Sequence, residues 1–291
     1  MMSAQLWVSV VQIGCFFGLV ALGYYLVLEG ADFFNFALGP FAMFSGLTAS
    51  WLMAKQGWPL GLAAVLGIAI AAVLAVVTEV ALVRPIDART GGGELPSLIA
   101  VVAVLFAVEQ LAGTLFGRQL MPGRSWLPGT SLDLGFVTVD GQTIVLVAAT
   151  IVSFTGVWLW MRKSKYGRIL RAVGSNREAA RTLGMPVGRV RLVAFALAGL
   201  VVGLAGQLFS AKAGVSFQSG FGWALSGFLA LVIGGTGSVW APLAGGLLLA
   251  LAQTLVPYYL GSASLDYAVL AVAILFFALR PSGLFVRRVR V

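Results

Sequence analysis

Long apolar runs, separated by short polar segments, dominate the hydropathy pattern of the chain. Because a helix needs about 20 mostly apolar residues to cross the hydrocarbon core of a bilayer, each long run is a candidate span. The pattern predicts spans at 7–28, 36–54, 60–83, 96–117, 142–161, 190–211, 222–234, 239–257 and 265–280. We therefore expect an all-α, polytopic transmembrane bundle with eight or nine spans.

Two stretches depart from this regular pattern. The segment at 29–40 is polar and carries glycine at the end of a span, and the apolar run at 222–234 is short. Irregular backbone is tolerated inside a membrane only where protein or a water-filled cavity satisfies its polar groups, and transporters use such broken helices. We expect a broken or re-entrant helix at one of these places. The first apolar run is preceded by no Lys or Arg, which favours a first membrane helix over a cleaved signal.

The composition leads to the same class of protein. Of the 291 residues, 60% are apolar and 10% are charged, whereas soluble domains are about 45 to 50% apolar and about 25% charged. We expect an integral membrane protein in which residues 1–291 form a single transmembrane domain, with no room for a soluble catalytic domain. The single cysteine, Cys15, excludes an internal disulfide and a cysteine-based metal cluster, and the absence of histidine removes the usual general base and zinc ligand. We expect no catalytic site, no metal and no cofactor.

Positive charge is concentrated in two segments. Residues 162–191 hold nine Lys and Arg against one acid, a balance of 9 − 1 = +8, and the tail after residue 279 adds four arginines. The positive-inside rule places both segments in the cytoplasm, and the even number of four spans between them agrees. Residues 84–94 then lie inside and residues 118–142 outside. This orientation accounts for the net charge of +9, so we expect no nucleic-acid partner.

The basic loop at 162–191 contains the signals of a short helix. Ser175 and Glu178 have the spacing of a capping box, Gly184 can adopt the left-handed conformation that ends a helix, and Pro186 prevents continuation. These signals predict a helix of about two turns near 176–183. Such a short helix is marginal in isolation, so it needs a surface to bind.

Two surfaces fit this helix equally well from its residues alone. Ala179, Ala180 and Leu183 form a small apolar stripe that could enter a groove on a partner protein. Arg177 and Arg181 flank the stripe and could instead hold the helix on anionic lipid headgroups.

Small residues recur on the span at 190–211. Gly199, Gly203 and Gly206 are spaced so that they fall on one face of a helix. Small residues on a shared face let two membrane helices approach closely, so we expect this face to pack against a neighbouring span.

Four motifs together resemble one known family. The run from Gly167 to Gly184, with Glu178-Ala179-Ala180 before the glycine, resembles the EAA-type cytoplasmic loop of permease subunits in bacterial ABC importers. More narrowly, the chain resembles the permeases of branched-chain amino-acid importers, whose relatives carry urea and short-chain amides. The segments at 35–39, 234–238 and 280–285 match that family in the same order. Leu38 stands where the family often has a histidine.

The resemblance implies a multi-pass permease of the bacterial inner membrane with no ATP site of its own. It implies as partners a second, related permease, two cytoplasmic ATP-binding subunits, a periplasmic or extracellular substrate-binding protein, and membrane lipid. By the resemblance the loop helix is the coupling helix that receives the ATPases, and its contact residues are Glu178, Ala179, Ala180, Leu183 and Gly184.

The two glycine-rich motifs are candidates for the translocation pathway. The residues concerned are Asn35, Gly39, Gly234, Gly235, Gly237 and Ser238. For the first motif the alternative is a helix boundary at the membrane interface, with Asn35 as a cap or as an interhelical hydrogen-bond partner. For the second motif the alternative is a tight turn between helices. The second motif lacks the glycine spacing and the lysine of nucleotide-binding loops, so we expect no nucleotide there.

A rival hypothesis is an autonomous secondary transporter or channel for small polar solutes such as urea or amides. Such a protein would use charged pairs inside the membrane, which are costly and therefore functional. Glu79 is expected to be interfacial or paired with Arg84, and Glu109 to hydrogen-bond within the bundle. No pairing of intramembrane charges is evident along the chain, which argues against the rival hypothesis.

Overall fold

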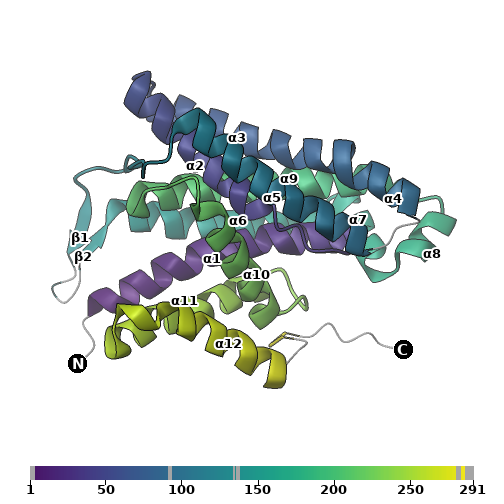
Figure 1. Ribbon diagram of the computed structural model, residues 1–291. Helices are drawn as coiled ribbons and strands as arrows, with labels where there is room; N and C mark the ends of the chain where they lie inside the picture. Colours follow the sequence, from purple (N-terminus) through teal and green to yellow (C-terminus); the bar gives the residue numbers. More distant parts are fainter. Residues whose placement is uncertain (1–3, 91–93, 134, 136–137, 280–282, 286–291) are drawn as a thin grey trace.

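The computed structural model of the protein describes residues 4–90, 94–133, 135, 138–279 and 283–285, and these form a helical bundle (Figure 1). Its α-helices are α1 (Ala4–Ala31), α2 (Leu38–Lys55), α3 (Leu60–Val77), α4 (Arg84–Thr90), α5 (Glu94–Phe116), α6 (Gly141–Lys163), α7 (Lys165–Ser175), α8 (Arg177–Thr182), α9 (Val187–Ala213), α10 (Ser219–Gly234), α11 (Ala241–Leu260) and α12 (Leu265–Leu279). A π-helical turn, η1 (Thr78–Val83), joins α3 to α4, and a 3-10 turn, η2 (Ser262–Ser264), precedes α12. Strands β1 (Ser131–Asp133) and β2 (Thr138–Asp140) form a small antiparallel hairpin.

The predicted spans coincide with helices, and their bounds agree within three residues except where α3 continues through η1 and α4. Within the described residues, six segments are long and apolar enough to cross a membrane. They are Ala4–Ala31, Leu60–Thr90, Leu95–Phe116, Gly141–Lys163, Val187–Ala213 and Ala241–Leu260. The expected all-α membrane bundle is therefore confirmed, whereas the count of eight or nine spans stays a prediction.

Helices α1 and α9 form an antiparallel pair at the centre of the bundle. Near one end of the pair, Phe16 stacks on Phe209 with ring centroids 4.0 Å apart. Near the other end, Gly30 lies against Ala194. Residue numbers rise along α1 as they fall along α9, so the two helices run in opposite directions.

Glycines let the neighbouring helices approach these two closely. A Cβ atom on Gly206 of α9 would overlap the carbonyl oxygen of Ala42 on α2, and one on Gly199 would lie 2.7 Å from the Cα of Ala72 on α3. A side chain at either glycine would force the helices apart. The expectation of close packing on this face of α9 is confirmed. Gly246 of α11 packs against the backbone of α1 in the same way.

The bundle contains an inverted internal repeat that the hydropathy pattern did not reveal. The units are α1–α2–α3 and α9–α10–α11: the second helices begin 219 − 38 = 181 residues apart and the third helices 241 − 60 = 181 residues apart. Because α1 and α9 are antiparallel, the two units have opposite directions. Faint sequence signals accompany the repeat, since Gly39 and Ser45-Gly46 correspond to Gly220 and Ser226-Gly227 at the same offset.

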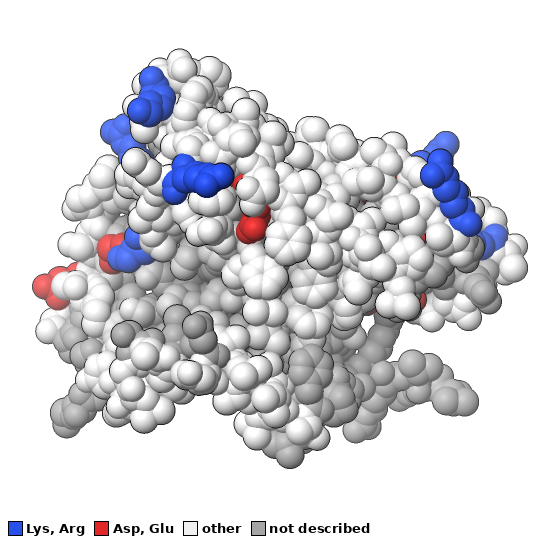
Figure 2. Space-filling model, in the orientation of Figure 1, with Lys and Arg blue, Asp and Glu red and all other residues white. Residues whose placement is uncertain are grey.

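Charged side chains gather toward two ends of the molecule, with an uncharged band between them in the view of Figure 2. Helices α4, α7 and α8 lie at one end, and the β1–β2 hairpin lies at the other, where α1 begins (Figure 1). We call the first the α8 end and the second the hairpin end. The grouping agrees with the predicted sidedness, in which residues 84–94 and 162–191 share one side of the membrane and residues 118–142 lie on the other.

Candidate functional site

The basic loop folds as two helices rather than the single one predicted. The additional helix, α7, is capped by Ser164, whose hydroxyl accepts a hydrogen bond from the Gly167 backbone N–H at 2.8 Å. Leu170 and Val173, one turn apart, are buried against the bundle. This capping serine and the i, i+3 spacing were visible in the sequence and could have revealed α7.

Helix α8 is capped by a different residue from the one predicted. Asn176 has extended backbone angles, and its side-chain oxygen accepts a hydrogen bond from the Ala179 N–H at 2.8 Å. Ser175 is instead the last residue of α7, and its hydroxyl donates to the Arg171 carbonyl at 2.8 Å. The prediction of Ser175 as cap was wrong, because α7 extends to that residue and keeps it in helical conformation.

The end of α8 follows the prediction. Gly184 has φ of +71°, the left-handed conformation that glycine adopts without steric cost. Its N–H donates to the Arg181 carbonyl, and the Met185 N–H donates to the Ala180 carbonyl, both at 3.0 Å. This pair of bonds is the Schellman arrangement, which satisfies carbonyls that the end of a helix leaves without partners.

The predicted apolar stripe of α8 divides between two surfaces. Ala180 is buried in a small cluster with Val173 of α7 and Val187 of α9. Leu183 points outward with 74% of its surface exposed, and Ala179 is exposed as well. Glu178 lies on the helix, but its side chain is outside the described part of the structure. One face of α8 therefore attaches it to the bundle while the other is available to a partner.

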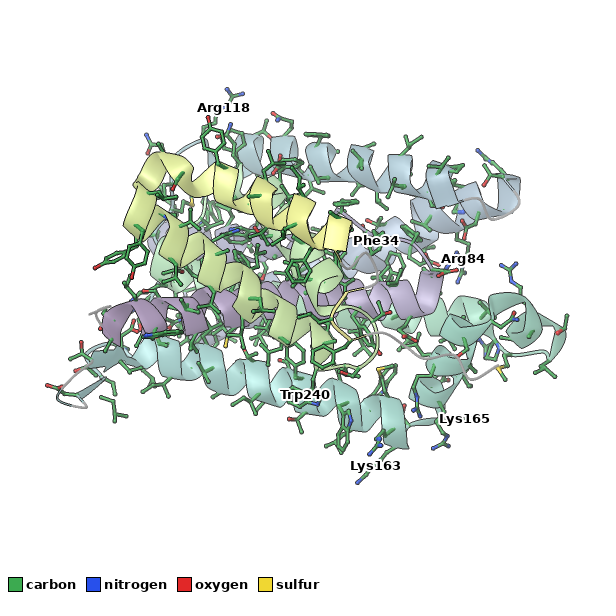
Figure 3. All side chains as sticks on the ribbon, turned by 90° about the horizontal axis from the view of Figure 1, so that it is seen from below. Phe34, Arg84, Arg118, Lys163, Lys165 and Trp240 are labelled. Atoms are coloured by element: carbon green, nitrogen blue, oxygen red, sulfur yellow. The ribbon has the colours of Figure 1, made fainter. Side chains whose placement is uncertain are left out.

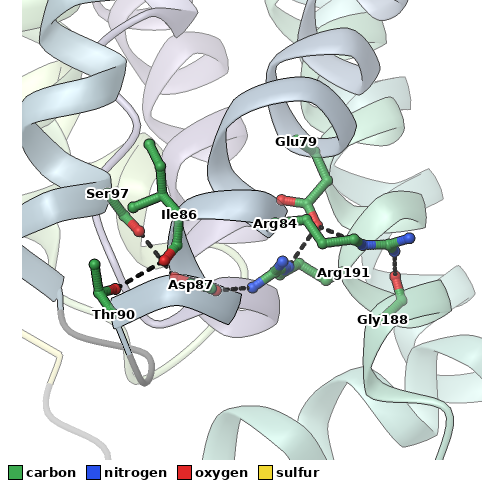
Figure 4. A network of polar contacts seen from close by, with 8 residues as sticks. All are labelled: Glu79, Arg84, Ile86, Asp87, Thr90, Ser97, Gly188 and Arg191. Carbon is green, nitrogen blue, oxygen red and sulfur yellow. Dashed lines mark hydrogen bonds and ion pairs between the residues drawn. The ribbon is translucent and has the colours of Figure 1, made fainter.

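A buried ionic network lies next to this helix, where α9 begins (Figure 4). The Arg191 guanidinium donates through Nε to Glu79 Oε1 at 2.5 Å and through Nη1 to Asp87 Oδ2. Arg191 is 4% exposed and Glu79 fully buried. Arg84, the predicted partner of Glu79, is farther away, with its Nε at 3.9 Å.

The network corrects the expectation that no charges pair inside the protein. Glu79 and Arg191 are 112 positions apart in the sequence, so no local spacing could reveal their pairing. The network also connects several elements: Ser97 of α5 donates to Asp87 Oδ1, and Arg84 donates to the Gly188 carbonyl of α9, both at 2.9 Å. Glu79 lies in η1, and π-helical turns of this kind are frequent at functional sites.

The glycine-rich turn after α10 is also at the α8 end. Gly235 has φ of +84°, and the turn is joined to the chain near its C-terminus, where the Gly237 N–H donates to the Phe285 carbonyl at 2.8 Å. The Phe285 N–H donates to the Gly234 carbonyl at 3.0 Å. Two motifs that the sequence places about 50 residues apart, at 234–238 and 280–285, therefore meet, although Arg280, Pro281 and Ser282 lie outside the described residues.

Asn35 and Gly39 lie elsewhere, in the interior where the two repeats cross. Asn35 is fully buried in the bend between α1 and α2, and its Oδ1 accepts a hydrogen bond from the Ala37 N–H at 3.1 Å. Its Nδ2 has no partner among the described residues. A Cβ atom on Gly39 would overlap the Gly220 carbonyl oxygen, so the first turns of α2 and α10 touch.

Glu109 supports the same crossing from α5. Its Oε1 accepts a hydrogen bond from the Phe221 N–H at 2.7 Å, in the first turn of α10. A carboxylate at this position satisfies an unpaired helix N–H and matches the positive end of the helix dipole. The expectation that Glu109 hydrogen-bonds within the bundle is confirmed. The structure thus separates the candidate pathway residues into an interior group and a group at the α8 end.

Comparison with known proteins identifies the family. Residues 7–279 match the family model described as the permease component of branched-chain amino acid transport systems. The chain belongs to this family.

Individual permeases are similar to the chain over most of their length. The chain is 26% identical over 289 residues to the high-affinity branched-chain amino acid transport system permease protein LivH of Escherichia coli K12. The aligned region covers 94% of this chain and 92% of LivH. It is 25% identical over 293 residues to BraD of Pseudomonas aeruginosa, covering 96% and 94%. A probable LivH of Methanocaldococcus jannaschii is 26% identical over 247 residues, covering 84% and 78%. Family membership and the apolar helices confirm a transport permease located in a membrane, as predicted for the bacterial inner membrane.

Proposed function

We propose that the protein is the membrane-spanning subunit of an ATP-driven importer that carries branched-chain or other apolar amino acids into the cell. The match of residues 7–279 to the permease family carries this proposal, and the names of the full-length relatives supply the substrate class. The partners are a second, related permease, two cytoplasmic ATP-binding subunits and an external substrate-binding protein. ATP hydrolysis takes place on the partner subunits and not on this chain.

Helix α8 is the element on which the ATP-binding subunits act in this proposal. Its outward surface combines exposed Leu183 and Ala179 with the open backbone at Gly184, where an added Cβ atom would meet nothing within 4 Å. Glu178 belongs to the same helix. A groove on a partner subunit would remove the apolar surface of Leu183 from water, which favours binding.

The ionic network is the route by which movement of α8 reaches the membrane helices. Ala180 of α8 packs against Val187 in the first turn of α9, and Arg191 lies one turn further along. Arg191 in turn binds Glu79 and Asp87 on the α3–α4 segment. A displacement of α8 therefore moves α9 and the α3–α4 segment together, because a buried charge is strongly disfavoured once it leaves its partners.

The translocation pathway in this proposal has two parts. Asn35 and Gly39 contribute the interior part, where short helices of the two inverted units meet, and transporters built from inverted repeats place their sites at such junctions. Gly234, Gly235, Gly237 and Ser238 contribute the part at the α8 end. The switch between inward- and outward-facing states follows the ATP state of the partner subunits, which shifts the populations of the two conformations.

Reconstitution tests the proposed function. The permease is placed in liposomes alone or with its second permease, ATP-binding subunits and binding protein, and leucine uptake is measured with and without ATP. We expect uptake only by the full assembly with ATP. Uptake by this chain alone, driven by an ion gradient, would instead support an autonomous secondary transporter.

A further inference from the structure

A polar pocket of about 240 Å³ lies at the α8 end, between α1, α6, α7 and the turn that follows α10. Two guanidinium groups line it, Arg162 at the end of α6 and Arg171 on α7. Thr236 and Ser238, which carry hydroxyl groups, line it from the turn that follows α10. Guanidinium groups and hydroxyls are the hydrogen-bond donors that proteins use to bind phosphate.

The pocket stands beside an apolar surface of the bundle. Ile151 and Val152 of α6 are 53% and 69% exposed, as expected of side chains that face lipid. Trp158 lines the pocket as well, and the Arg162 guanidinium lies over its ring, 4.7 Å from the centroid. Tryptophan is enriched at the level of lipid headgroups, so α6 leads from a hydrocarbon-facing surface to a pocket at headgroup level.

The residues that line the pocket carry a net positive charge. Glu29 also lines it, but this carboxylate is buried beneath α7, where a Cβ atom on Gly174 would lie 2.5 Å from Oε2. The lining therefore carries two positive charges and one negative, 2 − 1 = +1. Lys163 and Lys165 lie at the end of α6 and the start of α7 and point away from the bundle (Figure 3), and neither residue lines the pocket.

We propose that this pocket binds the phosphate of an anionic phospholipid headgroup, with the acyl chains lying along α6. Basic pockets between membrane helices on the cytoplasmic side recognise headgroups by these contacts. A bound headgroup would tie α7 to the turn at 236–239. Because α8 follows α7 directly, the lipid would restrict the position of the proposed coupling helix. The inference requires the predicted membrane orientation but not the proposed substrate.

Native mass spectrometry of the detergent-purified assembly, titrated with phosphatidylglycerol, tests this site. The test variant is Arg162→Gln with Arg171→Gln. The matched control is Lys163→Gln with Arg168→Gln, which removes two charges from the same segment without touching the pocket lining. A basic residue near an anionic surface contributes roughly fivefold to binding, so we expect roughly 25-fold weaker binding of the first lipid to the test variant. The control should retain that binding event.

Two outcomes would overturn the proposal. Equal losses in both double variants would show a general effect of charge and no specific pocket. Binding of millimolar inorganic phosphate, with no binding of phosphatidylglycerol, would show that the pocket takes free phosphate and not a lipid headgroup. Phosphatidylcholine, which has the same phosphate but no net charge, should bind more weakly than phosphatidylglycerol. The readout is binding alone, so a failure of leucine transport leaves this test intact.

Discussion

Arg191 is the cation that two acids of the ionic network share. It lies between two carboxylates, those of Glu79 and Asp87, and is almost fully excluded from solvent. Taking a charge out of water is costly, and opposite charges repay the cost only while the geometry is maintained. Each member of the network therefore depends on the others, and the loss of the shared cation affects two acids at once.

We expect Arg191→Met to destabilise the folded permease by about 3 to 5 kcal/mol, because it removes the nearest counter-charge of the fully buried Glu79. Thermal unfolding of the purified chain in detergent measures the effect. Adding Glu79→Gln should recover part of the loss, since it removes the buried negative charge that Arg191 balanced. If the destabilisation of the double variant equalled the sum of the two single effects, the ion pair between Arg191 and Glu79 would contribute nothing to stability.

Glu109 illustrates a buried acid with a structural explanation. Its contact with the Phe221 N–H requires only an acceptor oxygen, which glutamine also offers. We therefore expect Glu109→Gln to leave ATP-driven uptake by the assembled importer within several-fold of the unaltered protein. Abolished uptake by a normally assembled complex would indicate that ionisation of Glu109 matters and would revive the secondary-transporter hypothesis.

At the scale of elements, α8 is a short helix whose two ends are defined by specific residues. Asn176 caps its start, and Gly184 ends it in a left-handed conformation. Its six residues make few hydrogen bonds within the helix. The capping interactions at its two ends therefore determine its stability, whereas a long helix would tolerate their loss. The attachment of Ala180 to α7 and α9 supplies the remaining support.

We expect Gly184→Val to weaken binding of the ATP-binding subunits while leaving membrane insertion and pairing with the second permease unchanged. A side chain in the left-handed conformation costs roughly 1 to 2 kcal/mol, and more for a β-branched residue, which corresponds to about five- to thirtyfold in binding. Co-purification of the ATP-binding subunits with the permease measures this.

Gly57→Val is a matched control. Gly57 has φ of +65° and open space around it, but it lies in the turn between α2 and α3, away from α8. Undiminished recovery of the ATP-binding subunits with Gly184→Val would contradict the assignment of α8 as coupling helix. If replacement of Arg181 were the more damaging change, α8 would instead rest on the lipid surface.

At the scale of the whole molecule, the inverted repeat explains how short and long helices are arranged. Long helix α9 packs against α2 and α3 of the first unit, and α1 packs against α10 and α11 of the second. Each unit thus completes the core of the other. The two units also meet at Gly39 and Gly220, where the first turns of α2 and α10 touch.

Single-cysteine labelling in a Cys15→Ser background checks the orientation of the whole bundle. We expect a membrane-impermeant reagent applied to intact cells to label a cysteine at Thr130, near the hairpin, and not one at Ser175. The charge balance of +8 in the basic loop favours the cytoplasm for Ser175. Labelling of Ser175→Cys from outside would show that the bundle has the opposite orientation. It would then place α8 on the side of the membrane that the cytoplasmic ATP-binding subunits cannot reach.

The class of protein, the bounds of the long apolar helices to within about three residues, and the end of α8 at Gly184 could all be predicted from the amino-acid sequence. These features depend on residues that are neighbours in the chain: a run of apolar side chains must be buried in lipid or protein, and glycine alone adopts the left-handed conformation without cost. The family motifs were equally visible, because each lies within a short segment.

Which distant segments meet could be learned only from the folded chain. The pairing of Arg191 with Glu79 and Asp87, the contact of 283–285 with the turn after α10, and the crossing of α2 with α10 all join residues dozens to hundreds of positions apart. Ser175 shows the same limit locally, because the extent of α7 depends on Leu170 and Val173 being buried against other helices. Hydropathy and capping signals indicate that a segment must be buried or capped. The packing between segments determines which residues bury it or complete its hydrogen bonds and ion pairs.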